Sequence, residues 1–360
     1  MKRFLALLLI LSLGLSLIGC QAKNQANTAS EDKQTITDMA GRSLEIPQEI
    51  KTAYSTGPVG TVFLYTLAPH KLAGWNSPLR EIEKRYIKAE FHNLPSLGVW
   101  RGSNTTGSIE ELLRTKPDIV ISMGDVSPEY IADADAIQAQ IGIPVIMVDG
   151  SLENLNASYE FLGKLLGRED RAGELGTYCA DVLKRVEDLG ANLPEEEQVR
   201  VYYAEGSYGL DTEPKGSINA EAIEMAGAFN VADAGNLEVR RMQASMEQIV
   251  MWEPELIIVS SDGDEKQAIY NLILEDKAWS NVKAVREKNV FEVPCAPYDW
   301  INRPPSVARI LGMQWLANLL YPDIYTIDIR EEAEKFFELF YDYSLTGGEM
   351  DRLFEFAERG

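Results

Sequence analysis

One unit of helix and strand occurs twice in the sequence, and this repeat limits the possible folds more than any other feature. The segment SIEELLRTKPDIVISMGD (108–125) aligns without gaps with SMEQIVMWEPELIIVSSD (245–262). Each copy predicts a short helix, a break at a proline and a buried strand, and each helix begins with the spacing of a capping box. Strands that are apolar throughout are typical of parallel sheets covered by helices on both faces. We therefore expect two similar α/β lobes.

Further apolar runs extend the repeat into two alternating series of strands and helices. The strands of the first lobe are predicted at 51–55, 71–74, 118–122 and 144–148, and those of the second at 199–204, 230–232, 255–260 and 289–293. This order predicts two Rossmann-like lobes, each a parallel sheet flanked by helices. A helical pattern from Leu152 to about Leu189 lies between them. It predicts one long helix that joins the lobes and permits only small relative motion.

The N-terminal residues predict export. Two cations precede an apolar run over residues 4–18, and Cys20 directly follows Gly19. A run this short with these flanks is typical of a secretory signal peptide. The Gly-Cys pair resembles the lipobox of bacterial lipoproteins, which implies cleavage before Cys20 and lipidation of that residue; an ordinary signal peptide with an incidental Cys is the alternative. Residues 21–35 are small and polar and predict a flexible tether.

Charge and cysteine content exclude some classes of protein. The chain has 56 acidic and 34 basic residues, a net charge of −22 that becomes −24 without the two cations of the signal region. So acidic a surface argues against a nucleic-acid partner. Cys179 lies within a predicted helix, and we expect no disulfide between it and Cys295. No later run of about 18 apolar residues occurs, so the mature chain is expected to be anchored to a membrane without spanning it.

Several segments resemble a known family. ITDMAGRSLEIPQEIKTAYST (36–56), LGKLLGREDRA (162–172), RPPSVARILGMQWLANLLYP (303–322) and the repeat are similar to the substrate-binding lipoproteins of ABC importers. The resemblance is to the class that handles iron–siderophore complexes, haem and vitamin B12, and it covers about residues 36–343. It implies a two-lobed monomer that holds a ligand between its lobes and delivers it to a permease dimer with its ATPase. The domains expected are a signal peptide (1–20), a tether (21–35), an N-terminal lobe (36–150), a bridging helix (151–195) and a C-terminal lobe with the C-terminal helices (196–360), with the family's binding region at about 51–325.

The resemblance gives the repeat a second meaning. In this family each lobe presents a surface Glu that pairs with Arg residues of the permease, and the matching positions here are Glu110 and Glu247. Two equivalent carboxylates would meet two equivalent basic patches on a two-fold partner. The alternative is that each Glu only favours the positive end of its helix dipole.

Ligand contacts are expected in the segments that follow the strands, because doubly wound sheets bind ligands outside the carboxyl ends of their strands. Rings can stack on a flat ligand, and guanidinium groups can bind carboxylates, catecholates or oxyanions. The candidates are Trp75, Trp100, Arg101, Tyr208, Tyr298, Trp300 and Arg303. Each has a structural alternative, such as lobe packing for Trp75 or an ion pair with Asp299 for Arg303. Pro304 and Pro305 predict a rigid corner before a helix over 306–320.

Together these features predict an exported solute-binding protein on the extracytoplasmic side that captures a metal chelate, first of all an iron–siderophore complex. Haem, a corrinoid, or a molybdate or tungstate oxyanion bound by Arg101 or Arg303 are alternatives. An exported hydrolytic enzyme is a distant alternative, because the sequence has no G-x-S-x-G, phosphate-loop or H-E-x-x-H motif. The two histidines, His70 and His92, and the scattered cysteines predict no protein-borne metal site and no cofactor, so a transported metal would arrive already chelated.

Overall fold

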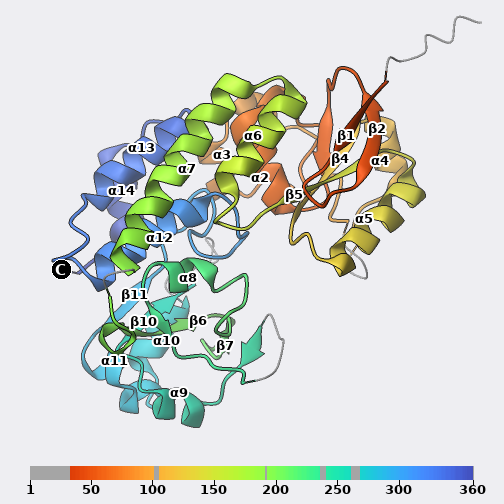
Figure 1. Ribbon diagram of the computed structural model, residues 1–360. Coiled ribbons are helices and arrows are strands. Elements are labelled where there is room, and N and C mark those ends of the chain that lie inside the picture. The colour runs from red at the N-terminus through yellow and green to blue at the C-terminus, as the bar shows by residue number, and fades with distance from the viewer. Residues whose placement is uncertain (1–32, 101–104, 191–192, 236–240, 261–267, 360) are drawn as a thin grey trace, which may run out of the picture. The chain divides into compact units, whose positions relative to one another are not determined.

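The computed structural model describes residues 33–100, 105–190, 193–235, 241–260 and 268–359 (Figure 1). Residues 34–360 belong to one compact unit. It contains two parallel sheets, as the alternating pattern of strands and helices predicted. No helix in the described ranges combines the length and the apolar character that crossing a bilayer requires.

The first sheet has the strand order β3-β4-β5, and all of its pairs are parallel. Register places Ala53 opposite Ile119 and Val120 opposite Val145. We call this sheet and the helices around it the N-terminal lobe. Its elements are β3 (Ala53–Ser55), α2 (Pro58–Leu67), η1 (Pro69–Lys71), α3 (Glu81–Tyr86), η2 (Ala89–Phe91), α4 (Ile109–Thr115), β4 (Ile119–Gly124), α5 (Pro128–Ile141) and β5 (Val145–Asp149), preceded by the two-stranded sheet of β1 (Lys33–Thr37) and β2 (Ser43–Pro47).

The second sheet has the order β11-β10-β6-β8, again with parallel pairs. We call it, with its helices, the C-terminal lobe. Its elements are η4 (Glu195–Glu197), β6 (Arg200–Ala204), β7 (Asp211–Thr212), α8 (Glu221–Met225), β8 (Phe229–Asn230), β9 (Met242–Gln243), α9 (Met246–Trp252), β10 (Leu256–Val259), α10 (Ala268–Glu275), η5 (Trp279–Asn281), α11 (Lys283–Arg286) and β11 (Val290–Glu292); α12 (Ala308–Leu320), α13 (Ile329–Tyr341) and α14 (Gly347–Phe354) complete the chain.

Both sheets are buried on both faces, which is why their strands are apolar without alternation. Successive side chains of a strand point to opposite faces. On β4, Ile119 and Ile121 join the large cluster that also contains α7 and α12, while Val120 joins a separate cluster on the other face. On β10, Ile258 and Ile257 divide in the same way. The large cluster is continuous from the first sheet to the second.

The predicted helix over 152–189 is two helices, α6 (Leu155–Leu166) and α7 (Glu169–Gly190), packed side by side (Figure 1). The chain turns at Gly167, whose φ of 63° is left-handed and ends α6. Glycine adopts this conformation without a steric penalty and commonly ends a helix in this way. The sequence prediction missed the break because both flanking segments are helical. The 22-residue α7 packs against α12 and links the lobes.

The structure also tests the predictions for the repeat, the two cysteines and the strand at 71–74. The two repeat copies form α4–β4 and α9–β10, and their cap residues Ser108 and Ser245 each accept a hydrogen bond from the backbone N–H three residues on. Cys179 and Cys295 are both buried, and no disulfide joins them. The strand predicted at 71–74 is wrong: the segment contributes only an isolated bridge from Leu72 to Ala53.

Candidate ligand-binding cleft

A cavity of ≈ 490 Å³ lies between loops of the two lobes. One wall follows β3 and comprises the start of α2 and the loop that leads into α3. The other wall is the segment between β11 and α12. The lining residues are Pro58, Thr61, Val62, Trp75, Asn76, Ser77, Pro78, Leu79, Arg80, Glu83, Tyr298, Asn302, Arg303 and Pro304. Each wall therefore lies beyond the carboxyl end of a parallel strand, where ligands of such sheets bind.

Each lobe contributes one guanidinium group to the cavity. Arg80 precedes α3 and donates through Nε to Glu83 Oε1 at 2.9 Å. Arg303 donates through Nε to Glu205 Oε1 at the same distance. The two Arg side chains are 34% and 35% exposed. Guanidinium groups held in place by a carboxylate, with part of their surface open, are suited to bind an anionic ligand from two sides.

The α2 helix begins at the cavity with its positive end uncovered. Pro58 occupies the first turn, and Gly57 supplies no side-chain cap. No acidic residue lies in that first turn. The N-terminus of a helix offers backbone N–H groups and a favourable dipole to an anion, so α2 adds to the electrostatic preference set by Arg80 and Arg303.

Arg303 is held by a network of buried acidic residues on the side away from the cavity. Glu205 is fully buried at the end of β6 and also lies 3.7 Å from Arg241 Nε. Glu213 is buried beside it, and its two carboxylate oxygens accept hydrogen bonds from Asn302 and Asn219 at 3.0 and 3.1 Å. Burial, followed by the charge of Glu205, raises the pKa of Glu213 to about 7. Protonation of Glu213 relieves repulsion between the two carboxylates without freeing Arg303 from Glu205.

Asp299 is the third acid of this network and shapes the loop. It is buried, and its Oδ1 accepts from the backbone N–H of Ile301 and Asn302 at 2.8 and 3.0 Å. Ser260 Oγ donates to Oδ2 at 3.2 Å. Burial raises the pKa of Asp299 to about 6. Asp299 therefore fixes the turn that carries Asn302 and Arg303 into the cavity, and it is not the partner of Arg303.

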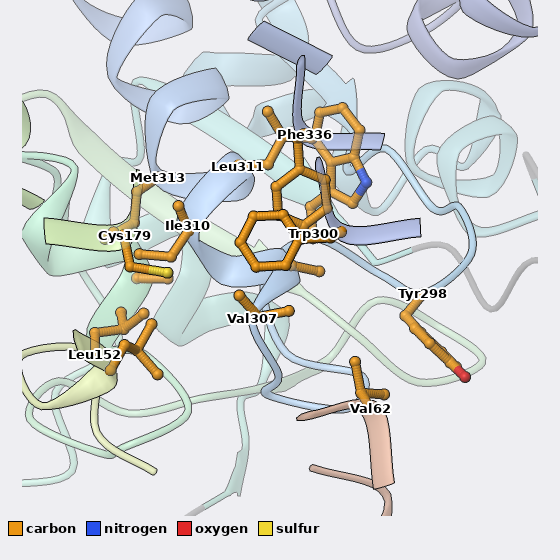
Figure 2. Close-up of a cluster of buried hydrophobic side chains, with 14 of the residues drawn as sticks. Val62, Leu152, Cys179, Tyr298, Trp300, Val307, Ile310, Leu311, Met313 and Phe336 are labelled. Atoms are coloured by element: carbon orange, nitrogen blue, oxygen red, sulfur yellow. The ribbon is translucent and has the colours of Figure 1, made fainter. Parts of the chain in front are cut away.

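Of the predicted aromatic contacts, Tyr298 and Trp75 line the cavity. Tyr298 points its hydroxyl away from the neighbouring apolar cluster (Figure 2), and burial raises its pKa well above the ordinary value, so it remains a neutral phenol. Trp75 is mostly buried, and its Nε1 donates to the carbonyl of Phe91 at 2.8 Å. Only a small part of its ring is available to a ligand.

The expectation that Trp300 contacts the ligand is wrong. Trp300 has no exposed surface and packs in the apolar cluster with Val307 and Phe336 (Figure 2). Its Nε1 donates to the carbonyl of Ala296 at 3.1 Å, and any side chain at Gly312 of α12 would overlap its carbonyl oxygen. The segment YDWINR thus places Tyr298, Asn302 and Arg303 at the cavity and Trp300 and Ile301 in the core. The helix that follows begins at Ala308, two residues later than predicted.

The remaining candidates do not meet in the cavity. Trp100 is 2% exposed, and its Nε1 donates to the carbonyl of Leu97, so it is a core residue. Tyr208 is 68% exposed and lies in a separate small depression. Arg101 and Cys20 lie outside the described residues. Glu110 and Glu247 are exposed at the second positions of α4 and α9, which are equivalent places in the two copies of the repeat.

Sequence reasoning missed Arg80, Glu205 and Glu213. Arg80 follows the Trp75–Pro78 segment, and Glu205 comes directly after β6, so their position at strand ends was a usable signal. The pairing of Glu205 with Arg303 spans 98 positions, and no signal in the sequence indicated it. Within the part of the chain that the structure describes, no group of three or more His, Cys, Asp or Glu side chains is arranged to hold a metal ion.

Comparison with known proteins agrees with this geometry. The family model described as "Periplasmic binding protein" matches residues 76–296, more than half of the 360 residues. The chain belongs to the periplasmic binding protein family. A solved ABC transporter solute binding protein from Sulfurospirillum deleyianum is 31% identical, with a TM-score of 0.80 over 89% of this chain and 99% of that one.

Two further relatives extend the comparison. A periplasmic solute binding protein from Veillonella parvula is 27% identical, with a TM-score of 0.71 over 91% of this chain and 98% of that chain. The molybdate-binding protein MolA of Haemophilus influenzae is 26% identical over 357 residues, 90% of this chain and 95% of MolA. Family membership makes this protein an extracytoplasmic binding protein of an ABC transporter, with the two-lobed fold of that family.

Proposed function

We propose that this protein binds an oxyanion of the molybdate or tungstate type between its lobes and delivers it to an ABC permease. The observation that carries the proposal is the pair of guanidinium groups, Arg80 and Arg303, one from each lobe, facing one cavity at the uncovered start of α2. A compact anion needs N–H donors from several directions and no stacking surface. The molybdate-binding relative MolA supports this choice.

The burial of the aromatic candidates weighs against the metal chelate that the sequence favoured. Trp100 and Trp300 are in the core, and Trp75 offers little surface, so few rings remain to stack on a flat ligand. An anionic metal chelate, such as an iron–siderophore complex, stays the second candidate because the cavity of ≈ 490 Å³ exceeds what a tetrahedral oxyanion alone requires. Tyr298 would then supply the aromatic contact. We propose no resident metal or cofactor and no enzymatic activity.

Titration with a panel of ligands tests the proposal. Isothermal calorimetry of the purified protein is expected to give saturable binding of molybdate and tungstate. Sulfate and phosphate serve as competitors of similar shape, and a ferric catecholate complex represents the second candidate. Binding of the ferric complex with no response to molybdate or tungstate would replace the first candidate by the second. No binding of any of these anions would refute an anion site between Arg80 and Arg303.

The attachment and docking of the protein complete the proposal. We propose that Cys20 carries the lipid anchor and that the tether runs from residue 21 to the start of β1 at Lys33, which is three residues shorter than the sequence predicted. Residues 36–150 and 196–360 are proposed as the lobes, with 151–195 between them. We propose further that Glu110 and Glu247 pair with basic residues of the permease dimer. Their exposure at equivalent positions of the two repeat helices supports this role. The binding protein is proposed to act as a monomer.

A further inference from the structure

A second and larger cavity, a groove of ≈ 840 Å³, lies in the N-terminal lobe. It is formed by the end of β2, the η1 turn and the end of α6. The residues lining it are Gln34, Gln48, Glu49, Ile50, Lys51, Ala68, His70, Lys71, Lys164, Leu165, Leu166, Gly167 and Arg168. None of these residues lines the cavity between the lobes, so the basic groove, as we call it, is distinct from the proposed ligand site.

The charge of this groove is opposite to that of the chain. Four cations, Lys51, Lys71, Lys164 and Arg168, line it with a single acid, Glu49, in a protein with 56 acidic and 34 basic residues. The groove therefore attracts anions, whereas the net negative charge of the rest of the protein repels them.

These cations have no ionic partners among the described residues. Lys51, Lys164 and Arg168 are exposed and take part in no ion pair there, and Lys71 donates only to the backbone carbonyl of Ile50. Many other cations of the protein do pair with acids, Arg171 on the neighbouring helix among them. With so many acidic residues on the chain, four adjacent unpaired cations indicate that an external anion neutralises them.

The position of the groove identifies the source of that anion. Gln34, one of its lining residues, is the second residue of β1, where the proposed tether enters the N-terminal lobe, only 14 positions after Cys20. A flexible chain of this length has a root-mean-square span of about 20 Å. A body attached in this way keeps the basic groove close to the membrane, where lipid headgroups are concentrated. Lys side chains are flexible point charges, which suit a fluid layer of phosphates better than one fixed ligand.

We propose that the basic groove is a contact surface for the headgroups of anionic phospholipids. It rests on the proposed membrane attachment and extends it, because the groove restrains the N-terminal lobe at the membrane surface beyond what a flexible tether can do. Each Lys or Arg near an anionic surface strengthens binding about fivefold. Loss of three such cations therefore lowers the lipid-dependent contact by roughly a hundredfold.

Lysine acetylation followed by mass spectrometry tests the contact on the full mature protein. The protein is combined with nanodiscs of phosphatidylcholine alone or with about 30% phosphatidylglycerol. We expect the acetylation of Lys51 and Lys164 to fall at least about threefold with phosphatidylglycerol, and to recover in about 0.5 M NaCl, because salt screens exposed charges. Lys184 and Lys277, which are exposed elsewhere, are the internal controls and should not change.

Three outcomes would overturn the proposal. One is unchanged reactivity at Lys51 and Lys164, and another is equal protection of Lys184 and Lys277. The third is equal protection by free glycerol phosphate with phosphatidylcholine nanodiscs, which would make the groove a small-anion site. The mass of the mature N-terminus reports separately whether Cys20 carries lipid, so failure of the anchor and failure of the groove are distinguishable.

A matched pair of variants excludes a general effect of net charge. Lys51→Gln/Lys164→Gln/Arg168→Gln removes three exposed cations from the groove, and Lys184→Gln/Lys277→Gln/Lys288→Gln removes three from other surfaces. Hydrogen–deuterium exchange around residues 69–71 and 164–168 is the readout, since it does not depend on lysine chemistry. The groove variant should lose the protection caused by phosphatidylglycerol, and the control variant should keep it. Loss of protection in both variants would contradict the proposal.

Discussion

Replacement of Arg309 by Met is expected to lower the free energy of unfolding by about 3 kcal/mol, because Arg309 forms a buried ion pair with Glu221 and also bonds to Gly150 of the N-terminal lobe. Its side chain is 1% exposed, and Nη1 donates to Glu221 Oε2 at 2.7 Å. Nη2 donates to the carbonyl of Gly150, at the end of the N-terminal lobe, also at 2.7 Å. Glu221 in turn accepts from the backbone N–H of Leu152 at 3.2 Å.

The magnitude follows from what the substitution leaves behind. Removing one partner of a buried pair costs about 3–5 kcal/mol, since the remaining charge loses its compensation. Glu221 is 20% exposed and regains some water, which places the loss at the lower end of that range. Met fills much of the space of the Arg side chain, so a cavity adds little.

Urea unfolding measures this decrease in the free energy of unfolding, and two further variants serve as comparisons. Arg309→Met/Glu221→Gln should be more stable than Arg309→Met alone by about 1–2 kcal/mol, because the amide leaves no buried charge. Arg330 also makes ion pairs, with Asp351 and Glu358, but at an exposed position. Arg330→Met should therefore cost no more than about 1 kcal/mol. A loss below about 1 kcal/mol in Arg309→Met would refute the view that this buried pair stabilises the fold.

Three further predictions concern the core, the buried acids and the permease. Trp300→Ala should lower the free energy of unfolding by about 3–5 kcal/mol, measured by thermal or urea unfolding. A change near zero would contradict the assignment of Trp300 to the core and favour a ligand contact instead. Folded Glu213 retains a proton that the unfolded chain releases, so its contribution to the free energy of unfolding should fall as pH rises from about 4.5 to about 7. Urea unfolding across this range should show a smaller slope in Glu213→Gln than in the wild type, and an equal slope would contradict the assignment. Glu110→Arg/Glu247→Arg should abolish uptake in cells while calorimetry shows unchanged ligand binding, and normal uptake would exclude the docking role.

The architecture could be predicted from the sequence because buried strands and helices have recognisable patterns of apolar residues. β10 is apolar at every position and β4 at all but Ser122 and Gly124, since both faces of each sheet are covered, and the repeat located both strands with their preceding helices. The break at Gly167 was missed, because the segments on both sides of it have helical periodicity and a single glycine is tolerated inside a helical pattern.

The cleft was predictable in position and less so in composition. The rule that ligands bind at strand ends led to the segment of Tyr298 and Arg303, and both line the cavity. The same rule could not separate Tyr298 from Trp300, because two neighbouring aromatic residues in one loop look alike until packing buries one of them. The partner of Arg303 is Glu205, from a distant strand, and only the folded chain brings these two side chains together.

Calorimetric titration of molybdate into the wild type and into Arg80→Gln/Arg303→Gln tests the central claim most directly. The glutamines keep polar N–H donors at the cavity walls and remove both guanidinium charges. The wild type is expected to bind, and the variant to lose at least about a hundredfold in affinity, since each charge-assisted contact contributes about 1.5–3 kcal/mol. Circular dichroism of the variant should match that of the wild type. Equal affinity in the two proteins would contradict the account that an anion is held between Arg80 and Arg303.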